Sequence, residues 1–186
     1  MNVNGNGKMI AVFGGSRVES NTPEYAQAYA VGKLLAGAGF TLLNGGYTGT
    51  MEASARGAKE NGGRVIGVTS PIFTAQSPNA YLDEEIPAHT LYTRIEAMVT
   101  RADGFIVLKG SMGTLAELMI VWNLAKIDAG FGKPIVLLGA HWGEVMRTLR
   151  EHLAVSQAEA SLLHLVGDPQ EAVALLAGYV LPHLER

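Results

Sequence analysis

The chain has 186 residues, of which 48% are hydrophobic and 17% charged, so it has the length of about one domain and the composition of a folded protein rather than a disordered one. Its 14 basic and 17 acidic residues give a net charge of −3, which provides no electrostatic reason to expect DNA or RNA as a partner. The absence of cysteine excludes disulfides, thiolate zinc sites and cysteine nucleophiles.

The chain start and the apolar runs bear on location. Residues 1–7 are polar and rich in Asn and Gly, so we expect them to be disordered and not a signal peptide. No apolar run reaches the ~18 residues of a membrane span. We therefore expect a cytoplasmic protein without a membrane partner, consisting of one domain over residues 1–186.

The first part of the chain alternates strand and helix signals. Short apolar runs without clean alternation are typical of strands buried on both faces of a sheet. Thr22 suits an N-cap and Pro23 a first helical position, while Gly62-Gly63 ends a later helix. In chain order the sequence predicts a strand at Met9–Phe13, a helix at Pro23–Ala38, a strand at Phe40–Leu43, a helix at Thr50–Asn61 and a strand at Arg64–Val68.

The stretch Ser70–Pro87 contains three prolines and is expected to be irregular, either as a flap or as a surface crossover. The segment Ala154–Asp168 is ambiguous and could hold a short helix and a small edge strand. The other predicted elements are a helix at Leu91–Arg101, a strand at Gly104–Leu108, a helix at Thr114–Asp128, a strand at Pro134–Leu138, and helices at Trp142–Leu153 and Pro169–Leu184.

Strands that alternate with helices predict an α/β fold, a three-layer Rossmann-like parallel sheet with helices on both faces. In such folds ligands bind beyond the carboxyl ends of the strands. Glycine-rich loops follow three of the predicted strands, and each leads towards a helix. They are Gly14-Gly15-Ser16-Arg17, Asn44-Gly45-Gly46-Tyr47-Thr48-Gly49 and Lys109-Gly110-Ser111-Met112-Gly113-Thr114.

Glycines and helix starts together form anion sites, because main-chain N–H groups approach a ligand closely there. Tight turns alone would explain any one of these loops. Three of them, with hydroxyls at Ser16, Thr48, Ser111 and Thr114, favour a site for a phosphorylated ligand. None matches G-x-G-x-x-G or G-x-x-x-x-G-K-[ST], which disfavours a standard dinucleotide fold or a kinase-like NTPase.

Glu117 and Arg94 are the charged residues of interest near these loops. Glu117 lies one turn after Thr114 on the same helix face, where the helix start favours the ionised carboxylate. Arg94 opens the preceding helix and could hold a phosphate by a bidentate contact. Spacing alone equally allows an acid that only complements the helix dipole and a solvated surface arginine.

The remaining polar residues indicate no other chemistry. Ser16 has no partnered histidine and is a poor nucleophile candidate, and no lysine context suggests a pyridoxal Schiff base. We expect neither a metal nor a cofactor. The histidines show no metal-ligand spacing: His89, His141, His152, His164 and His183.

The third loop and its flanks resemble the LOG (Lonely Guy) family. Gly110 to Glu117 is similar to the family signature P-G-G-x-G-T-x-x-E, preceded by Arg94-Ile95-Glu96-Ala97-Met98 and the run Ala102 to Leu108. Gly45-Gly46-x-x-Gly49-x-Met51 looks like the family loop G-G-G-x-x-G-x-M-G, and Gly14-Gly15-Ser16 matches its first-strand loop. The resemblance covers roughly residues 8 to 140.

The resemblance implies a Rossmann-like homodimer that hydrolyses a nucleoside 5′-monophosphate to a free base and ribose 5-phosphate. In plants and some bacteria the substrate is a cytokinin ribotide, and other bacterial relatives cleave ordinary purine or pyrimidine nucleotides. A related branch carries molybdenum cofactor without breaking it, so a non-catalytic binding or carrier protein is the alternative. The apolar Leu118–Trp122 stretch also favours a dimer.

Carried over by position, Arg94 and Glu117 match the catalytic pair of the family, and Gly110, Gly113 and Thr114 match its phosphate loop. Some positions depart from the pattern: Lys109 stands in place of proline, Ser111, Asn44 and Glu52 in place of glycine, and Tyr92 and Ile95 in place of the frequent His and Lys. The other residues expected to contact substrate are Gly14, Gly15, Ser16, Gly45, Gly46, Thr48, Gly49, Met98 and Ser111.

Overall fold

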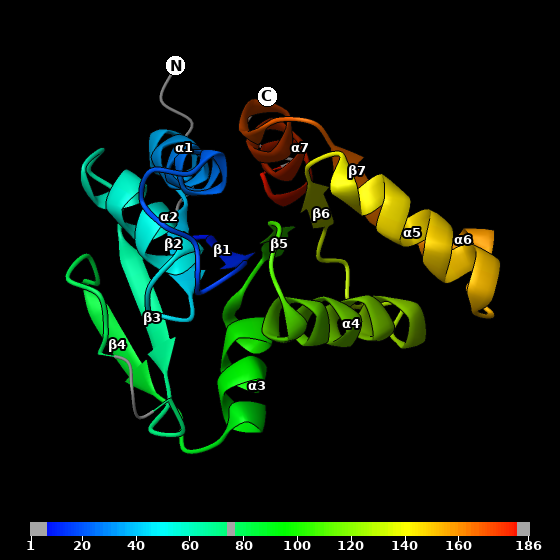
Figure 1. The fold of residues 1–186 in the computed structure, drawn as a ribbon, viewed down its shortest axis with the longest axis horizontal. Coiled ribbons are helices and arrows are strands. Elements are labelled where there is room, and N and C mark those ends of the chain that lie inside the picture. The colour runs from blue at the N-terminus through cyan, green and yellow to red at the C-terminus, as the bar shows by residue number, and fades with distance from the viewer. Residues whose placement is uncertain (1–6, 74–76, 182–186) are drawn as a thin grey trace.

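The computed structural model describes residues 7–73 and 77–181. The sequence predicts disorder for residues 1–7, and all of these except Gly7 lie outside the described residues. The described chain builds a seven-stranded parallel sheet of order β4-β3-β2-β1-β5-β6-β7 (Figure 1). Its strands are β1 (Met9–Phe13), β2 (Thr41–Asn44), β3 (Val65–Thr69), β4 (Glu84–Pro87), β5 (Gly104–Val107), β6 (Ile135–Leu138) and β7 (Leu163–Val166).

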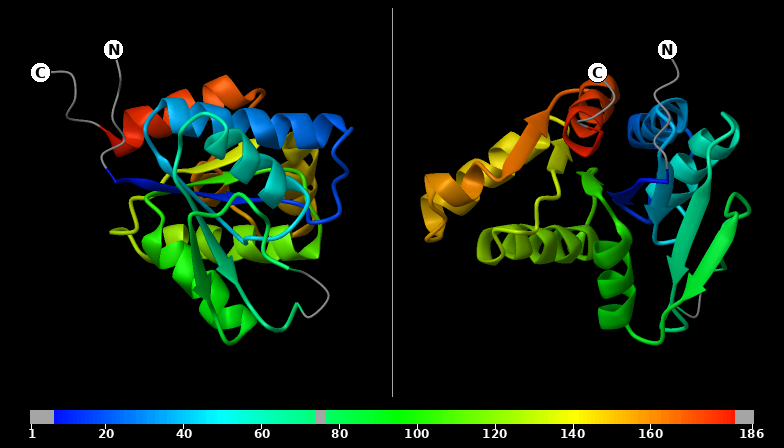
Figure 2. Two further views of the ribbon diagram at one scale, coloured as in Figure 1. Left: turned by 90° about the vertical axis from the view of Figure 1, so that its left-hand side faces the viewer. Right: turned by 180° about the vertical axis from the view of Figure 1, so that it is seen from behind.

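The helices cover both faces of this sheet, which confirms the predicted three-layer α/β fold (Figure 2). Their bounds are α1 (Pro23–Gly37), α2 (Thr50–Lys59), α3 (Leu91–Arg101), α4 (Met112–Ile127), α5 (His141–His152), α6 (Gln157–Ala160) and α7 (Pro169–Val180). Helices α1, α2 and α7 pack on the face that carries Ile10 and Val12, while α3, α4 and α5 pack on the face that carries Ala11 and Phe13. Alternate residues of β1 therefore enter two separate cores, as strand geometry requires.

Local signals set most of the helix starts. Helix α1 begins as expected, because the Thr22 hydroxyl accepts a hydrogen bond from the main-chain N–H of Tyr25 and Pro23 follows it. Helix α4 begins at Met112, two residues before its predicted start, with Ser111 as the N-cap. The Ser111 side chain makes no capping hydrogen bond, so it does not satisfy the N–H groups of the first turn.

One strand was missed, because β4 lies inside the stretch expected to be irregular. Its sequence Glu84-Glu85-Ile86-Pro87 is polar and mostly exposed, as suits the edge of a sheet, and it lacks the apolar run by which the other strands were recognised. An ion pair from Arg64 to Glu84 helps to hold it on β3. Five residues before β4, Asn79 donates its main-chain N–H to the carbonyl oxygen of Gly46, so part of the crossover from β3 to β4 packs on the second glycine loop.

The segment Ala154–Asp168, which the sequence left open, contains both α6 and the edge strand β7. The last helix, expected to reach Leu184, is described to Val180, and residues from 182 onward lie outside the described range. No helix in the described part of the chain has the length and apolar character needed to cross a membrane.

The strand order places the functional loops together. Strands β2, β1 and β5 are neighbours and run parallel, so the loops that follow them leave from the same edge of the sheet. These are the three glycine-rich loops of the sequence. The fold therefore gathers residues 14–17, 44–49 and 109–114 at one place beyond the carboxyl ends of the strands, where ligands bind in such sheets.

Candidate active site

The three glycine loops are joined by main-chain and side-chain hydrogen bonds. The N–H of Gly15 donates to the carbonyl oxygen of Lys109 at 3.3 Å, and the N–H of Thr50 donates to the carbonyl oxygen of Gly15 at 2.9 Å. The hydroxyl of Thr48 donates to the carbonyl oxygen of Ser16 at 3.0 Å. The loops thus form one connected wall, and the Thr48 hydroxyl takes part in holding it together.

Asn44 organises the second loop from inside. It is fully buried, its side-chain amide donates to the carbonyl oxygen of Met51 at 2.8 Å, and its side-chain oxygen accepts from the N–H of Gly46 at 2.8 Å. These bonds span the loop from its first residue to the start of α2. The asparagine that replaces the family glycine is therefore a structural residue.

A cavity of about 200 Å³ opens between these loops and helices α3 and α4, and we call it the Arg94–Glu117 cavity. It brings together most of the predicted site residues, namely Gly14, Ser16, Gly45, Arg94, Ser111, Gly113, Thr114 and Glu117. A second cavity of about 420 Å³, the Lys109 cavity, lies beside it and is lined by the predicted residues Gly15 and Gly110, with Ser16 and Ser111 common to both.

Four predicted site residues line neither cavity: Gly46, Thr48, Gly49 and Met98. Met98 lies one turn after Arg94 on α3, but its side chain has no exposed surface and packs in the core with residues of β1 and β5. It therefore does not reach the cavity. The side chains that the sequence missed are mainly apolar or aromatic: Val12, Phe13, Tyr47, Met51 and Phe73. Tyr47 stood within a loop already singled out, whereas Phe73 lies in the stretch Ser70–Pro87, for which the sequence allowed a flap but indicated no residue that contacts the site.

Arg94 is held rigidly at the base of the cavity. Only 5% of the residue is exposed, which excludes the solvated surface arginine. Its Nε donates to the carbonyl oxygen of Val68 at 2.7 Å and one terminal nitrogen to that of Gly45 at 3.0 Å. The guanidinium also lies 5.8 Å from the ring centre of Tyr47 and 5.2 Å from that of Phe73, within cation–π range.

The remaining terminal nitrogen of Arg94 faces Glu117, whose carboxylate lies 3.7 Å away. Glu117 is only 9% exposed, so it does more than complement a helix dipole at the surface. Burial raises the pKa of Glu117 from 4.5 to about 7, and the nearby charge of Arg94 offsets only part of that rise. The sequence predicted that the helix start would favour the ionised form, and that direction is wrong because desolvation outweighs it.

Two of the loop glycines are required by close packing around these residues. A Cβ atom on Gly45 would lie 1.7 Å from a terminal nitrogen of Arg94, and one on Gly110 would lie 2.0 Å from the hydroxyl oxygen of Thr114. By contrast, a Cβ on Gly113 would meet no atom within 4 Å. Gly113 therefore borders open space at the start of α4, where the N–H groups of a helix's first turn favour an anion.

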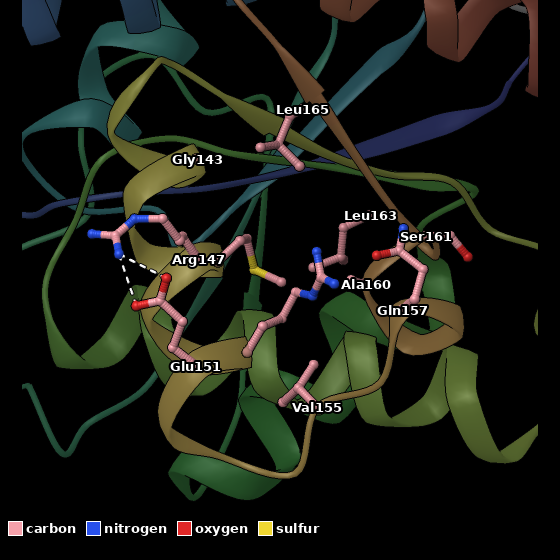
Figure 3. A pocket seen from close by; sticks show the side chains of 11 residues that line it. Gly143, Arg147, Glu151, Val155, Gln157, Ala160, Ser161, Leu163 and Leu165 are labelled. Carbon is pink, nitrogen blue, oxygen red and sulfur yellow. Dashed lines mark hydrogen bonds and ion pairs between the residues drawn. The ribbon is translucent and has the colours of Figure 1, made fainter.

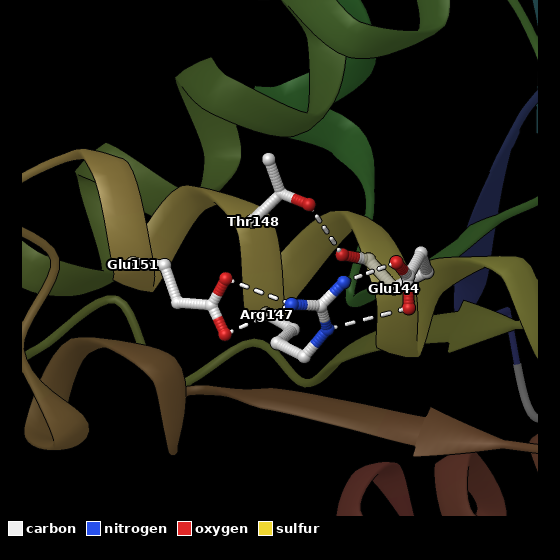
Figure 4. Close-up of polar contacts among 4 residues, drawn as sticks. All are labelled: Glu144, Arg147, Thr148 and Glu151. Carbon is white, nitrogen blue, oxygen red and sulfur yellow. Dashed lines mark hydrogen bonds and ion pairs between the residues drawn. The ribbon is translucent and has the colours of Figure 1, made fainter.

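A larger cavity of about 630 Å³ lies away from these loops, between α5, α6 and β7 (Figure 3). Two arginines line it, Arg147 and Arg150. Arg147 is neutralised on its own helix by Glu144 and Glu151, with hydrogen bonds of 2.7 and 2.9 Å to the two oxygens of Glu151 (Figure 4). Such exposed pairs three and four residues apart are typical of a solvated helix surface. We therefore assign the candidate site to the glycine loops. Within residues 7–73 and 77–181 no group of three or more metal-binding side chains is placed to hold an ion.

The chain matches a known protein family over most of its length. The model of the SLOG cluster4 family matches residues 7–173, which include every residue of the site. The chain belongs to the SLOG cluster4 family. The resemblance to the LOG family predicted from the sequence is thereby confirmed.

Three relatives show what this SLOG cluster4 protein is similar to. It is 35% identical over 130 residues to an uncharacterized protein of Archaeoglobus fulgidus, covering 70% of this chain and 83% of that one. It is 36% identical over 118 residues to a cytokinin riboside 5′-monophosphate phosphoribohydrolase of Mycobacterium tuberculosis, covering 62% of each. It is 31% identical over 169 residues to a pyrimidine/purine nucleotide 5′-monophosphate nucleosidase of Escherichia coli, covering 84% of this chain but only 36% of that protein.

Solved structures share the fold of this SLOG cluster4 protein. The molybdenum cofactor carrier protein of Chlamydomonas reinhardtii superposes with a TM-score of 0.75 at 27% identity, covering 95% of this chain and 99% of that one. The molybdenum cofactor binding protein of Rippkaea orientalis gives a TM-score of 0.74 at 24% identity, covering 93% and 97%. The second likeness shows the fold alone.

Proposed function

We propose that this protein hydrolyses the N-glycosidic bond of a nucleoside 5′-monophosphate, giving a free base and ribose 5-phosphate. The observation that carries the proposal is the buried Arg94–Glu117 pair, with its charges 3.7 Å apart in a cavity at the start of α4. The relatives named as nucleotide nucleosidase and phosphoribohydrolase support the choice of substrate class.

In the proposed reaction the bond from the ribose C1′ to the base breaks, and its electron pair leaves with the base. A water oxygen bonds to C1′, and one proton of that water passes to the base. Positive charge builds on the ribose as the bond breaks, so an ionised Glu117 carboxylate beside it stabilises the transition state or accepts the proton of water. A pKa of about 7 keeps both forms of Glu117 present near neutral pH.

Arg94 supports Glu117 in this scheme. Two of its nitrogens are already occupied by the carbonyl oxygens of Val68 and Gly45, so it cannot offer a free bidentate fork to a phosphate without giving up those bonds. We therefore assign the phosphate chiefly to the first turn of α4, around Ser111, Gly113 and Thr114, with the charge of Arg94 offsetting the repulsion between the phosphate and Glu117.

The test is incubation with nucleoside 5′-monophosphates, including a cytokinin ribotide, followed by chromatography for free base. We expect the wild-type protein to release base and Glu117→Gln to release it at least a hundredfold more slowly, a difference of about 3 kcal/mol. Glu96→Gln is the matched control, because Glu96 is exposed on α3 and lines neither cavity. An unchanged rate in Glu117→Gln would remove Glu117 from the mechanism.

A carrier function is the second candidate, favoured by the likeness to the molybdenum cofactor carrier protein over almost the whole length of both chains. A carrier would bind a phosphorylated ligand at the same loops and leave it intact. Thermal stabilisation by a ligand without release of base from any nucleotide would support the carrier and refute the hydrolase.

We also propose that the protein forms a homodimer through helix α4. This helix is apolar on its outer side as well as in the core, with Met112 and Ile127 strongly exposed and Ile120 partly so. Large exposed apolar side chains along one helix favour association. Light scattering at micromolar concentration tests this, and a monomeric mass would contradict it.

A further inference from the structure

The size of the Arg94–Glu117 cavity sets a limit on what it can hold. Sites for small ligands have volumes of about 300–1,000 Å³, whereas this cavity has about 200 Å³. The Lys109 cavity, of about 420 Å³, shares Ser16 and Ser111 with it. Since Ser111 is the N-cap of α4, the two cavities meet where an anion would sit.

The Lys109 cavity carries charged side chains that the proposed hydrolysis does not use. Arg17 and Lys109 line it together with Glu19 and Glu24. The Lys109 ammonium lies 2.9 Å from the Glu24 carboxylate, with the two side chains 59% and 35% exposed. Arg17 is exposed and makes no ion pair among the residues that the structure describes.

We propose that the Lys109 cavity binds a second phosphoryl group of the ligand, and that Lys109 recognises it, so that the site prefers nucleoside diphosphates to monophosphates. This rests on the proposed nucleotide site. With the first phosphate at the start of α4, the ribose faces Glu117 in one cavity. The other cavity then receives whatever is attached to the far side of that phosphate, and a basic side chain at its rim suits a second phosphate.

The ion pair with Glu24 does not block this role. Exposed ion pairs are weak because water solvates both partners, so little is lost when Lys109 exchanges one acceptor for another. A terminal phosphate carries more negative charge and more acceptor oxygens than a carboxylate, and its hydrogen bonds to an ammonium are charge-assisted. Glu24, which lies in the first turn of α1, would then turn to solvent.

Calorimetry with adenosine and uridine 5′-monophosphates and 5′-diphosphates tests the proposal, with each sample checked afterwards for free base. The wild-type protein should bind the diphosphate of at least one base at least tenfold more tightly than its monophosphate, as expected for one charge-assisted contact. Lys109→Met should abolish this preference, because it should lower diphosphate affinity at least tenfold more than monophosphate affinity. Glu24→Gln should raise diphosphate affinity, because it removes the competing carboxylate.

Lys126→Met is the matched control. Lys126 lies at the far end of α4, is half-exposed, and forms an ion pair with Glu159 of α6. Equal affinity for monophosphates and diphosphates in the wild-type protein would overturn the inference while leaving the proposed function standing. So would an equal loss of both affinities in Lys109→Met. Binding of neither kind of nucleotide would refute the proposed function as well. If Lys109→Met proves unstable, the direction of change in Glu24→Gln decides.

Discussion

The stability of the protein should fall as the pH rises from 5 to 8, and Glu117 should be the cause. At a pH below 4.5 the carboxyl is protonated in the folded and the unfolded chain, so its burial costs little. Above pH 4.5 the unfolded chain releases the proton while the folded protein retains it, because burial raises the pKa of Glu117 to about 7. The unfolded state is favoured progressively over that window, until the folded protein also releases the proton.

The size of the effect follows from the pKa. A rise from 4.5 to about 7 corresponds to about 3 kcal/mol of stability lost over the whole titration. Because the unfolded carboxyl is already mostly ionised at pH 5, about 2.5 kcal/mol of this loss falls between pH 5 and pH 8. Glu117→Gln cannot titrate, so the free energy of unfolding of this variant should lack that component.

Urea unfolding of the wild-type protein and of Glu117→Gln at pH 5, 6, 7 and 8 measures the difference between the two. All other titrating groups are common to both proteins, and Arg94 stays charged throughout, so it adds only a constant offset. We expect the wild-type protein to lose about 2.5 kcal/mol relative to the variant over this range. The reasoning would be refuted if the difference in free energy of unfolding between the two proteins stayed constant with pH, or if the wild-type protein gained stability relative to the variant as the pH rose. Either result would show that the ion pair with Arg94 outweighs the burial of Glu117.

Three further substitutions probe the site. Gly113→Ala should raise the free energy of unfolding by about 0.5 kcal/mol, since alanine favours helix and its Cβ meets open space, yet weaken nucleotide binding about tenfold by calorimetry. Gly45→Ala should lower the free energy of unfolding by about 1–3 kcal/mol, because its Cβ would collide with Arg94; unchanged urea unfolding would contradict that packing. Arg94→Lys should destabilise by about 2 kcal/mol, since lysine cannot bond both carbonyl oxygens; an equally stable variant would mean that these bonds matter little.

The elements that bury apolar runs could be predicted from the sequence, and β4 could not. Met9–Phe13 was predicted to the residue, because a strand buried on both faces is apolar at every position. The edge strand β4 is held by main-chain pairing and by ion pairs such as Arg64–Glu84, none of which leaves a local hydrophobic pattern. The start of α4 was placed too late because Met112 and Gly113 resemble a loop.

The sequence predicted the charged residues of the candidate site and missed its aromatic residues. Arg94 and Glu117 were each singled out by their position near the glycine loops, and only the family resemblance paired them, because spacing on two separate helices says nothing about whether two side chains meet. The pKa of Glu117 was predicted in the wrong direction, since the depth of burial depends on the packing of α3, α4 and the loops together. Phe73 lies in the cavity wall only because the crossover after β3 folds back, which a local pattern cannot show.

The central position of β1 has a consequence for synthesis of the chain. Its neighbour β5 is made much later, since Lys8 and Asp103, which pair at the ends of these strands, are 95 residues apart. Until β5 emerges from the ribosome, β1 is an open edge with apolar side chains, a state prone to misassembly between nascent chains. Arg94 and Glu117 lie on the two helices that flank β5 in the chain, so the proposed chemistry should be absent from the growing protein until α4 has also been made.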